Sequence, residues 1–119
     1  MQKTMKKKWV KALRSGEYQQ TRGALCNRNS RKKPSYCCLG VLCDVTGLGK
    51  WSKLRGEDFV AFYFIDPKTG KEEEAVTSTP ISLDDKYNIE RNEIINLIHM
   101  NDDKGCSFEE IAAFIEEKM

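Results

Sequence analysis

Residues 36–47, with the sequence YCCLGVLCDVTG, constrain the fold more than any other part of this 119-residue chain. They form the longest apolar run in the N-terminal half, and they hold three of the five cysteines. The start of the run has the pattern of a strand end, whereas residues 38–46 are predicted to form a helix. One face of this helix is apolar at Cys38, Val41, Leu42 and Val45. Gly47 lies where a left-handed C-cap residue is expected.

The length of the chain suits one domain with a single core, and we expect residues 1–119 to form it. No apolar run approaches the roughly 18 residues of a membrane span. The basic N-terminus is not followed by an apolar segment, so a signal peptide is not expected. These features predict a protein without a membrane partner that stays in the compartment where it is made.

The cysteines indicate a reducing cytoplasm rather than a disulfide framework. Their number is odd, and adjacent Cys37 and Cys38 pair poorly with each other. Structural zinc sites use knuckles spaced about two to four residues apart, and of the cysteines only Cys38 and Cys43 come close to that spacing. Metal binding is therefore the less favoured alternative, and no cofactor is expected. Free cysteine behaves as a small buried hydrophobe, which is the role that we predict.

The near-neutral total charge of +2 conceals two unlike halves. Residues 1–55 carry 14 Lys or Arg against two acidic residues, whereas residues 56–119 carry six against 16. A net charge of +12 in the first half indicates an anionic partner. The alternative is that the two halves neutralise each other within the fold or between subunits.

Residues 3–15 are predicted to form a helix, because Met5, Trp9 and Leu13 repeat every four residues and Gly16 suits a left-handed cap. Lysines and Arg14 occupy the rest of the helix surface. They form either an ordinary solvated face or a site that contacts phosphate. Residues 16–22 are expected to be a polar connection.

A basic loop at residues 27–34 is predicted to join two short paired strands at residues 24–26 and 35–37. Loops held by a rigid scaffold often carry function, so this loop is our first choice for an anion contact. Residues 48–56 are expected to be irregular and basic. Trp51, between Lys50 and Lys53, either stacks on a base while the cations hold phosphate or is part of the core.

The C-terminal half supplies the clearest strand, at residues 59–66. Both of its faces are apolar, which predicts a central strand or one covered by a partner. A turn at residues 66–70 leads to a charged edge strand at residues 71–77. Helices are predicted at residues 89–100, with Ile94, Ile95, Leu97 and Ile98 inward, and after a capping box formed by Ser107 and Glu110. We therefore expect an α+β fold in which a small, mainly antiparallel sheet is packed by three or four helices and ends in a helical hairpin.

The sequence does not predict an enzyme. His99 is the only histidine, and the cysteines have the pattern of buried residues rather than of exposed, electropositive nucleophiles. Gly40, Gly47 and Gly49 match neither nucleotide-binding fingerprint. Residues 105–115 are similar to the first helix of a helix-turn-helix, but no recognition helix follows and the segment is acidic.

Three motifs, WxxALRSGxY from Trp9, YCCLGVLCD from Tyr36 and NDxxGxSFEEIA from Asn101, resemble a family of short, mostly phage-encoded proteins. The resemblance covers residues 9–47 and about 94–117, and the double-cysteine motif is its most distinctive part. It assigns no activity and no catalytic residues. It implies a phage accessory protein that acts in the bacterial host cytoplasm on host machinery or host defence. This sequence differs from a typical compact member of that family in its long basic insertion at residues 27–34.

Our first hypothesis is a non-enzymatic counter-defence protein that sequesters a nucleotide immune signal. The expected phosphate contacts are Arg14, Arg22, Arg28, Arg31, Lys32 and Lys33, with Tyr18 or Trp51 stacked on the base. The alternatives are an inhibitor or regulator that binds a host protein, and a nonspecific nucleic-acid binder. The apolar two-sided strand predicts a homo-oligomer, because so small a sheet hardly covers both faces alone.

Overall fold

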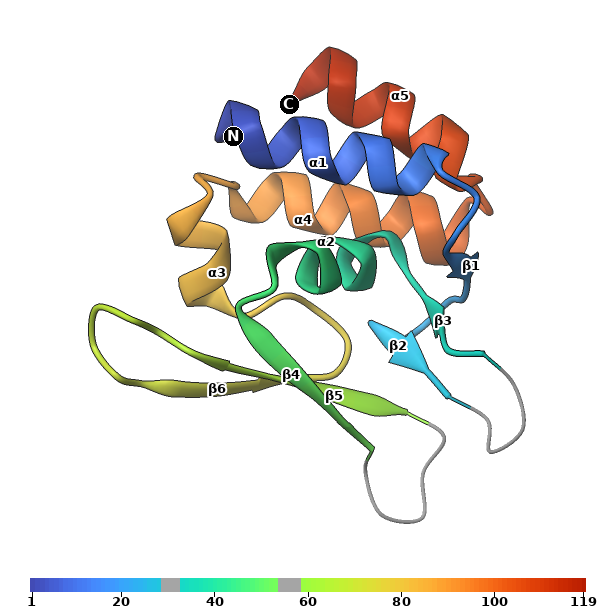
Figure 1. The fold of residues 1–119 in the computed structure, drawn as a ribbon. Helices are drawn as coiled ribbons and strands as arrows, with labels where there is room; N and C mark the ends of the chain where they lie inside the picture. The colour runs from blue at the N-terminus through green and yellow to red at the C-terminus, as the bar shows by residue number, and fades with distance from the viewer. Residues whose placement is uncertain (29–32, 54–58) are drawn as a thin grey trace.

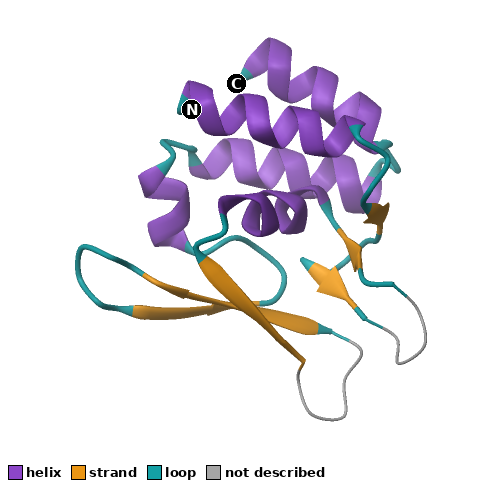
Figure 2. Ribbon diagram, in the orientation of Figure 1, coloured by secondary structure: helices purple, strands orange, loops and turns teal. Residues whose placement is uncertain are grey.

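The computed structural model describes residues 1–28, 33–53 and 59–119, and over these residues the chain is an α+β domain. The helices are α1 (Lys3–Arg14), α2 (Cys38–Thr46), α3 (Ile81–Lys86), α4 (Arg91–Ile98), the π-helix η1 (His99–Asp103) and α5 (Phe108–Lys118). The strands are β1 (Gln19–Gln20), β2 (Cys26–Asn27), β3 (Ser35–Tyr36), β4 (Gly49–Lys53), β5 (Val60–Ile65) and β6 (Glu72–Ala75). The strands gather on one side of the molecule, and α1, α4 and α5 stack on the other with α2 between (Figure 1). Figure 2 shows the same division between purple helices and orange strands.

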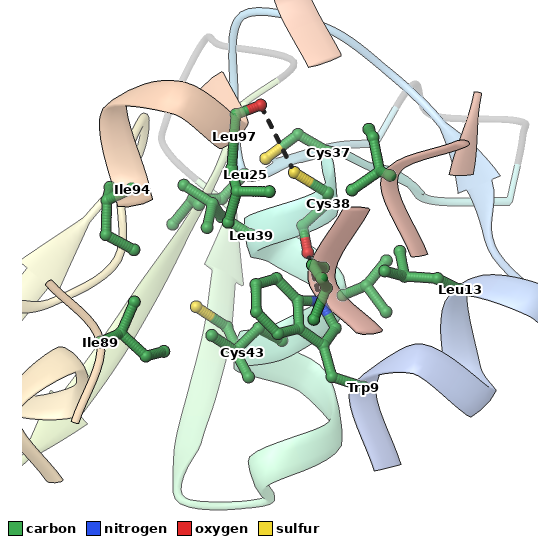
Figure 3. Close-up of a cluster of buried hydrophobic side chains, with 14 of the residues drawn as sticks. Trp9, Leu13, Leu25, Cys37, Cys38, Leu39, Cys43, Ile89, Ile94 and Leu97 are labelled. Carbon is green, nitrogen blue, oxygen red and sulfur yellow. Dashed lines mark hydrogen bonds between the residues drawn. The ribbon is translucent and has the colours of Figure 1, made fainter. Parts of the chain in front are cut away.

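Helix α2 is the centre of the core and has the predicted bounds. Every residue from Cys38 to Cys43 is buried, and Gly47 forms its left-handed C-cap at φ 65°. The indole Nε1–H of Trp9 donates to the carbonyl oxygen of Cys38 (2.9 Å), and the Cys38 thiol donates to the carbonyl oxygen of Leu97 (3.7 Å). Figure 3 shows these two hydrogen bonds among the apolar side chains. These two hydrogen bonds therefore hold α1 and α4 against the short central helix α2.

Gly40 sets how closely α2 approaches the backbone at Leu25. A Cβ atom added to Gly40 would lie 1.8 Å from the Leu25 carbonyl oxygen. That oxygen also accepts a hydrogen bond from the backbone N–H of Cys37 (3.1 Å), at the N-cap of α2. The glycine of the YCCLG sequence thus allows α2 to lie directly on the segment before β2.

Helix α1 presents the predicted apolar stripe to this core. Met5, Trp9 and Leu13 are buried, and Gly16 takes a positive φ of 77° after the helix ends. Helix α5 packs alongside α1 after the chain turns back at Gly105 (Figure 1). The predicted capping box of Ser107 and Glu110 starts α5 with both of its hydrogen bonds formed.

The first sheet has the strand order β1-β3-β2. The predicted antiparallel pair is present as β2 with β3, with Cys26 opposite Tyr36. Strand β1 was not expected, since residues 16–22 were predicted to be a connection, and it pairs parallel to β3. A two-residue strand carries no periodic pattern, so it exists because β3 offers it hydrogen-bonding partners.

The second sheet has the order β4-β5-β6 and is antiparallel throughout. Strand β5 is central and β6 is an edge strand, as predicted. The expectation of an irregular segment at residues 48–56 was wrong for Gly49–Lys53, which pair with β5 from Val60 to Phe64. A Cβ atom on Gly49 would lie 2.5 Å from the Tyr63 carbonyl oxygen, so the absence of a side chain at Gly49 permits this close pairing.

One face of β5 is more open than the sequence indicated. Phe62 and Phe64 are buried, whereas Phe59, Tyr63 and Ile65 are exposed, Ile65 to 58%. Similarly, Ile95 was expected to point inward from α4 but is 46% exposed. Both errors come from assigning burial by apolar character alone.

Two further elements differ from expectation. Helix α3 was not predicted, and the predicted helix at residues 89–100 starts at Arg91 and widens into η1 after Ile98. No helix among residues 1–28, 33–53 and 59–119 is both long and apolar enough to cross a membrane.

Candidate functional site

Asp44, at the C-terminal part of α2, joins the two aromatic residues that we expected to stack on a base. The Tyr18 hydroxyl donates to Asp44 Oδ2 (2.5 Å), and the Trp51 indole Nε1–H donates to Asp44 Oδ1 (3.1 Å). Both side chains are half-buried. Their polar atoms are therefore satisfied within the protein, and only ring surface remains for a ligand.

The aromatic rings form a continuous row from β1 to β5. Tyr18 and Tyr36 meet edge-on with ring centroids 5.2 Å apart, and Tyr36 and Trp51 do so at 5.6 Å. Trp51 then packs on Phe62 with centroids 5.0 Å apart. Burial, together with nearby Cys26 and Asp44, raises the pKa of Tyr36 to about 12, so its hydroxyl stays protonated at neutral pH.

A hollow of about 100 Å³ lies beside this row, and we call it the aromatic hollow. Its lining consists of Cys26, Arg28, Pro34, Tyr36, Trp51, Lys53 and Val60. Arg28 and Lys53 supply positive charge, and none of the lining residues within 1–28, 33–53 and 59–119 is acidic. Pockets that enclose a small molecule measure about 300–1,000 Å³. The aromatic hollow is therefore large enough for one group of a ligand, with the remainder lying across the surface.

The structure brings together only some of the predicted binding residues. Arg28 and Trp51 line the aromatic hollow, and Lys33 is exposed immediately before Pro34, which also lines it. Tyr18 belongs to the same aromatic row, one ring behind Tyr36. Arg31 and Lys32 lie outside the described residues.

Two of the predicted arginines are elsewhere. The guanidinium of Arg22 lies against Gly105, in the turn before α5. Arg14 donates from Nε to Glu109 Oε1 (3.1 Å) and from Nη1 to Glu116 Oε2 (3.0 Å), both on α5. Part of the charge of the basic half is thus neutralised within the fold, as the alternative interpretation held.

Sequence reasoning missed Tyr36 and Cys26 as lining residues and Asp44 as the residue that fixes Trp51. Tyr36 was assigned to the end of a strand, and nothing local marks it as a neighbour of Trp51. Lys53 was noted beside Trp51 but was not among the expected contacts. Cys26 lies opposite Tyr36 in the β2–β3 pair, and the bridge between Asn27 and Phe59 joins this pair to β5, against which β4 and Trp51 lie.

The thiols are unsuited to nucleophilic chemistry at this site. Burial raises the pKa of Cys26 to about 11 and that of Cys37 to about 11, and it also raises the pKa values of Cys38 and Cys43 well above the ordinary value of a thiol. The imidazole of His99 is on the surface, with Nδ1 2.5 Å from Asp103 Oδ2. In the parts of the chain that the structure describes, no three His, Cys, Asp or Glu side chains gather as metal ligands would.

Asn101, from the NDxxG sequence, is fully buried and holds the fold together. Its Oδ1 accepts from Gln20 Nε2 (2.8 Å) and from the backbone N–H of Cys38 (3.2 Å). Its Nδ2 donates to the carbonyl oxygen of Thr21 (2.8 Å) and to Asp102 Oδ1 (2.9 Å). With Trp9 and Gly40, it shows that the motifs behind the resemblance contribute residues to the core and its connections.

Comparison with known proteins gives one match. Neither a curated protein nor a solved structure is significantly similar to this chain. A family model described as "Domain of unknown function (DUF8296)" matches residues 1–119. Because the match covers the whole sequence, the chain belongs to the DUF8296 family.

Proposed function

We propose that this protein is a non-enzymatic accessory protein of the phage type that binds a phosphate-bearing ligand at the aromatic hollow. The observation that carries the proposal is the placement of Arg28 and Lys53 around the rings of Trp51 and Tyr36. The ligand class is a nucleotide, because it offers a ring to stack and a phosphate to pair. In a bacterial host the nucleotide would be an immune signal, and binding would sequester it.

The geometry supports stacking with little loss of conformational entropy. Trp51 is already fixed by Asp44 on one side and by Phe62 on the other. A preorganised ring loses less freedom on binding, and stacking of one base on an aromatic residue contributes about 1–3 kcal/mol. Arg28 adds a charge-assisted hydrogen bond to phosphate, which is stronger than a neutral one.

The two tryptophans provide a direct assay. Trp9 is fully buried and Trp51 is half-buried at the aromatic hollow, so quenching of intrinsic fluorescence by a bound base would come from Trp51. We expect quenching by some member of a panel of cyclic and linear nucleotides, with heat release in calorimetry. The Trp51→Phe variant should lose the optical signal while Trp9 fluorescence persists. A panel that gives neither quenching nor heat with folded protein would refute the nucleotide proposal.

Charge variants locate the binding site. Losing one hydrogen bond to a charged group costs about 1.5–3 kcal/mol, so Arg28→Gln and Lys53→Gln should each weaken binding about 10- to 150-fold. Lys68→Gln is the matched control because it removes the same charge in the exposed turn after Ile65, at the opposite end of β5 from lining residue Val60. Equal weakening by all three variants would mean that net charge, rather than this site, holds the ligand.

The counter-defence role is tested in cells. Expression in a bacterium that uses a nucleotide-signalling defence should restore plating of a sensitive phage. The Arg28→Gln variant should restore it less, at equal protein level. If Arg28→Gln restored phage plating as well as wild type does, the cellular role would not depend on the aromatic hollow.

A second candidate function is an inhibitor or regulator that binds a host protein. The observation that favours it is the exposed outer face of β5, where Phe59, Tyr63 and Ile65 leave apolar surface uncovered. This interpretation requires a stoichiometric partner, which affinity capture from host lysate would identify. Replacing Tyr63 and Ile65 by Ser should abolish capture, whereas Arg28→Gln should not. The same face could be covered by a second copy of the chain, and light scattering would report that homo-oligomer as twice the monomer mass.

A further inference from the structure

A larger and more strongly charged hollow lies on α1, apart from the aromatic hollow. It measures about 730 Å³, and we call it the lysine groove. Its lining consists of Lys3, Lys6, Lys7, Val10, Lys11, Arg14, Ser15 and Glu116. Its lining comes from α1, from Ser15 after it and from Glu116 of α5, whereas the lining of the aromatic hollow lies in or next to the strands β2, β3, β4 and β5. Helices α1 and α5 lie on the side of the molecule away from the β4-β5-β6 sheet (Figure 1).

The lysines of this groove repel one another without internal compensation. Lys3, Lys7 and Lys11 follow at intervals of four residues, which places them next to each other on one helix face. Like charges at this spacing destabilise a helix. Among residues 1–28, 33–53 and 59–119, no carboxylate lies within ion-pair distance of these three lysines. The fold therefore maintains a row of positive charges that weakens its own first helix.

Two carboxylates of α5 beside the groove are already engaged. Glu116, the one acidic lining residue, pairs with Arg14, as does Glu109. Glu110 completes the capping box of α5. Helix α5 thus neutralises the arginine at one end of the groove and leaves the lysine row for an external anion.

The composition of the groove indicates which anion. Protein–protein interfaces are depleted of Lys and rely on aromatic, Met and Arg anchors in desolvated pockets. The groove has Val10 as its one apolar side chain, and that residue is already buried. Lysine behaves as a mobile, hydrated point charge, and a row of such charges suits a repeating phosphate backbone.

We propose that the lysine groove is a second binding site, which takes the phosphate backbone of nucleic acid independently of sequence. Binding there releases counterions, so it weakens steeply with salt, and it does not require the aromatic hollow.

The test compares two variants of equal net charge. The first is Lys3→Gln/Lys7→Gln/Lys11→Gln, and the control is Lys68→Gln/Lys71→Gln/Lys104→Gln, whose residues are exposed and lie off α1. The probe is a 30-base-pair duplex DNA of random sequence, titrated by fluorescence anisotropy at salt concentrations from 50 to 200 mM. Wild type should bind at 50 mM salt. The groove variant should bind at least about tenfold more weakly, and the slope of log K against log salt should fall by about 0.9 for each phosphate that the variant no longer neutralises. The control should bind like wild type.

The midpoint of thermal unfolding distinguishes binding from a structural role of the lysines. If the lysines stabilised the fold, removing them would lower this midpoint. Because the substitutions remove repulsion within α1, the midpoint of unfolding of the groove variant should stay equal or rise while DNA binding falls. A Lys3→Arg/Lys7→Arg/Lys11→Arg variant keeps the charges and should keep the binding.

Four results would overturn the proposal. Wild type that binds no DNA at 50 mM salt would end it, as would equal weakening by the control. Poly-glutamate that competes as well as DNA would assign the groove to an acidic protein instead. A groove variant with a lowered unfolding midpoint would show that the lysines serve the fold. Quenching of Trp51 fluorescence by nucleotides is measured on the same variants. Failure of the DNA-binding test therefore does not decide whether the aromatic hollow binds a nucleotide.

Discussion

Replacing Gly40 by Ala sets local helix propensity directly against tertiary packing. Within a helix, Ala is more favourable than Gly by about 1 kcal/mol, so the sequence of α2 alone predicts a small gain in stability. The structure predicts a loss. The new Cβ would lie 1.8 Å from the Leu25 carbonyl oxygen and 2.7 Å from its carbonyl carbon. Since real Cβ contacts essentially never fall below 3.0 Å, α2 and the Leu25 backbone must separate by at least about 1.2 Å.

Neither side of this contact is free to move. The Leu25 carbonyl oxygen accepts from Cys37 N–H (3.1 Å), and the Leu25 N–H donates to the carbonyl oxygen of Val76 (2.7 Å). Overpacking a core costs about 1–3 kcal/mol, and each broken hydrogen bond costs about 0.5–1.5 kcal/mol. After subtraction of the propensity gain, we expect Gly40→Ala to lower the free energy of unfolding by about 1–5 kcal/mol.

Urea denaturation followed by far-UV circular dichroism measures this loss as a lower midpoint at unchanged slope. Gly16→Ala is the control, since Gly16 has φ 77° and open space around its Cα, so it carries the left-handed strain of about 1 kcal/mol and no clash. A variant that is too unstable to purify, beside soluble Gly16→Ala, is the extreme form of the expected result. A Gly40→Ala protein as stable as wild type, or more stable, would refute the reasoning.

Three further predictions follow from buried polar groups and thiols. Burial raises the pKa of Asp84 from 3.8 to about 6, opposed by the hydrogen bond from Thr79, so its charge costs up to about 3 kcal/mol above pH 6 and nothing below pH 3.8. Ionisation of Asp84 should therefore lower the free energy of unfolding of the wild type as pH rises from about 4 to 6. The Asp84→Asn variant should be more stable than wild type at pH 7.5 and equally stable at pH 4. A stability difference that is the same at both pH values would contradict this. Asn101→Asp removes the two Nδ2 donor bonds and places a charge beside Asp102, so urea denaturation should show a loss of about 3 kcal/mol or more, and a loss below about 1 kcal/mol would mean that the network contributes little. With a thiol reagent at pH 8, Cys106 should react first because it alone among the five cysteines is half-buried, and the other four should react on unfolding; rapid reaction of two or more would show that the interior opens readily.

The sequence predicted α1, α2, α5 and most of α4, because the signals for these helices act over a few residues, whereas it missed the short helix α3. The bounds of α2 follow from an apolar run ended by Gly47, and the start of α5 follows from the spacing of Ser107 and Glu110. The same holds for α1 and for the strand, turn and strand around Gly70. Periodicity, caps and turns are properties of neighbouring residues, so a single sequence displays them.

The strands β1 and β4 were missed because their partners define them. Gln19–Gln20 pair with β3, and Gly49–Lys53 pair with β5, but neither segment carries a strong pattern of its own. Burial on the outer face of β5 was also overestimated, because an apolar residue is buried only if another element covers it.

The sequence by itself determined that positive charge gathers in the first half, and it predicted buried cysteines, which the structure confirms for four of the five. Tertiary structure decided which cations can meet a ligand. Arg14 is paired with glutamates 95 and 102 residues away. Arg28 and Lys53 reach the same hollow because Asn27 bridges to Phe59 while Lys53 pairs with Val60. Trp51 faces that hollow with its indole N–H bound to Asp44. Contacts between residues far apart in the chain leave no local pattern, and both candidate sites depend on which of those contacts form.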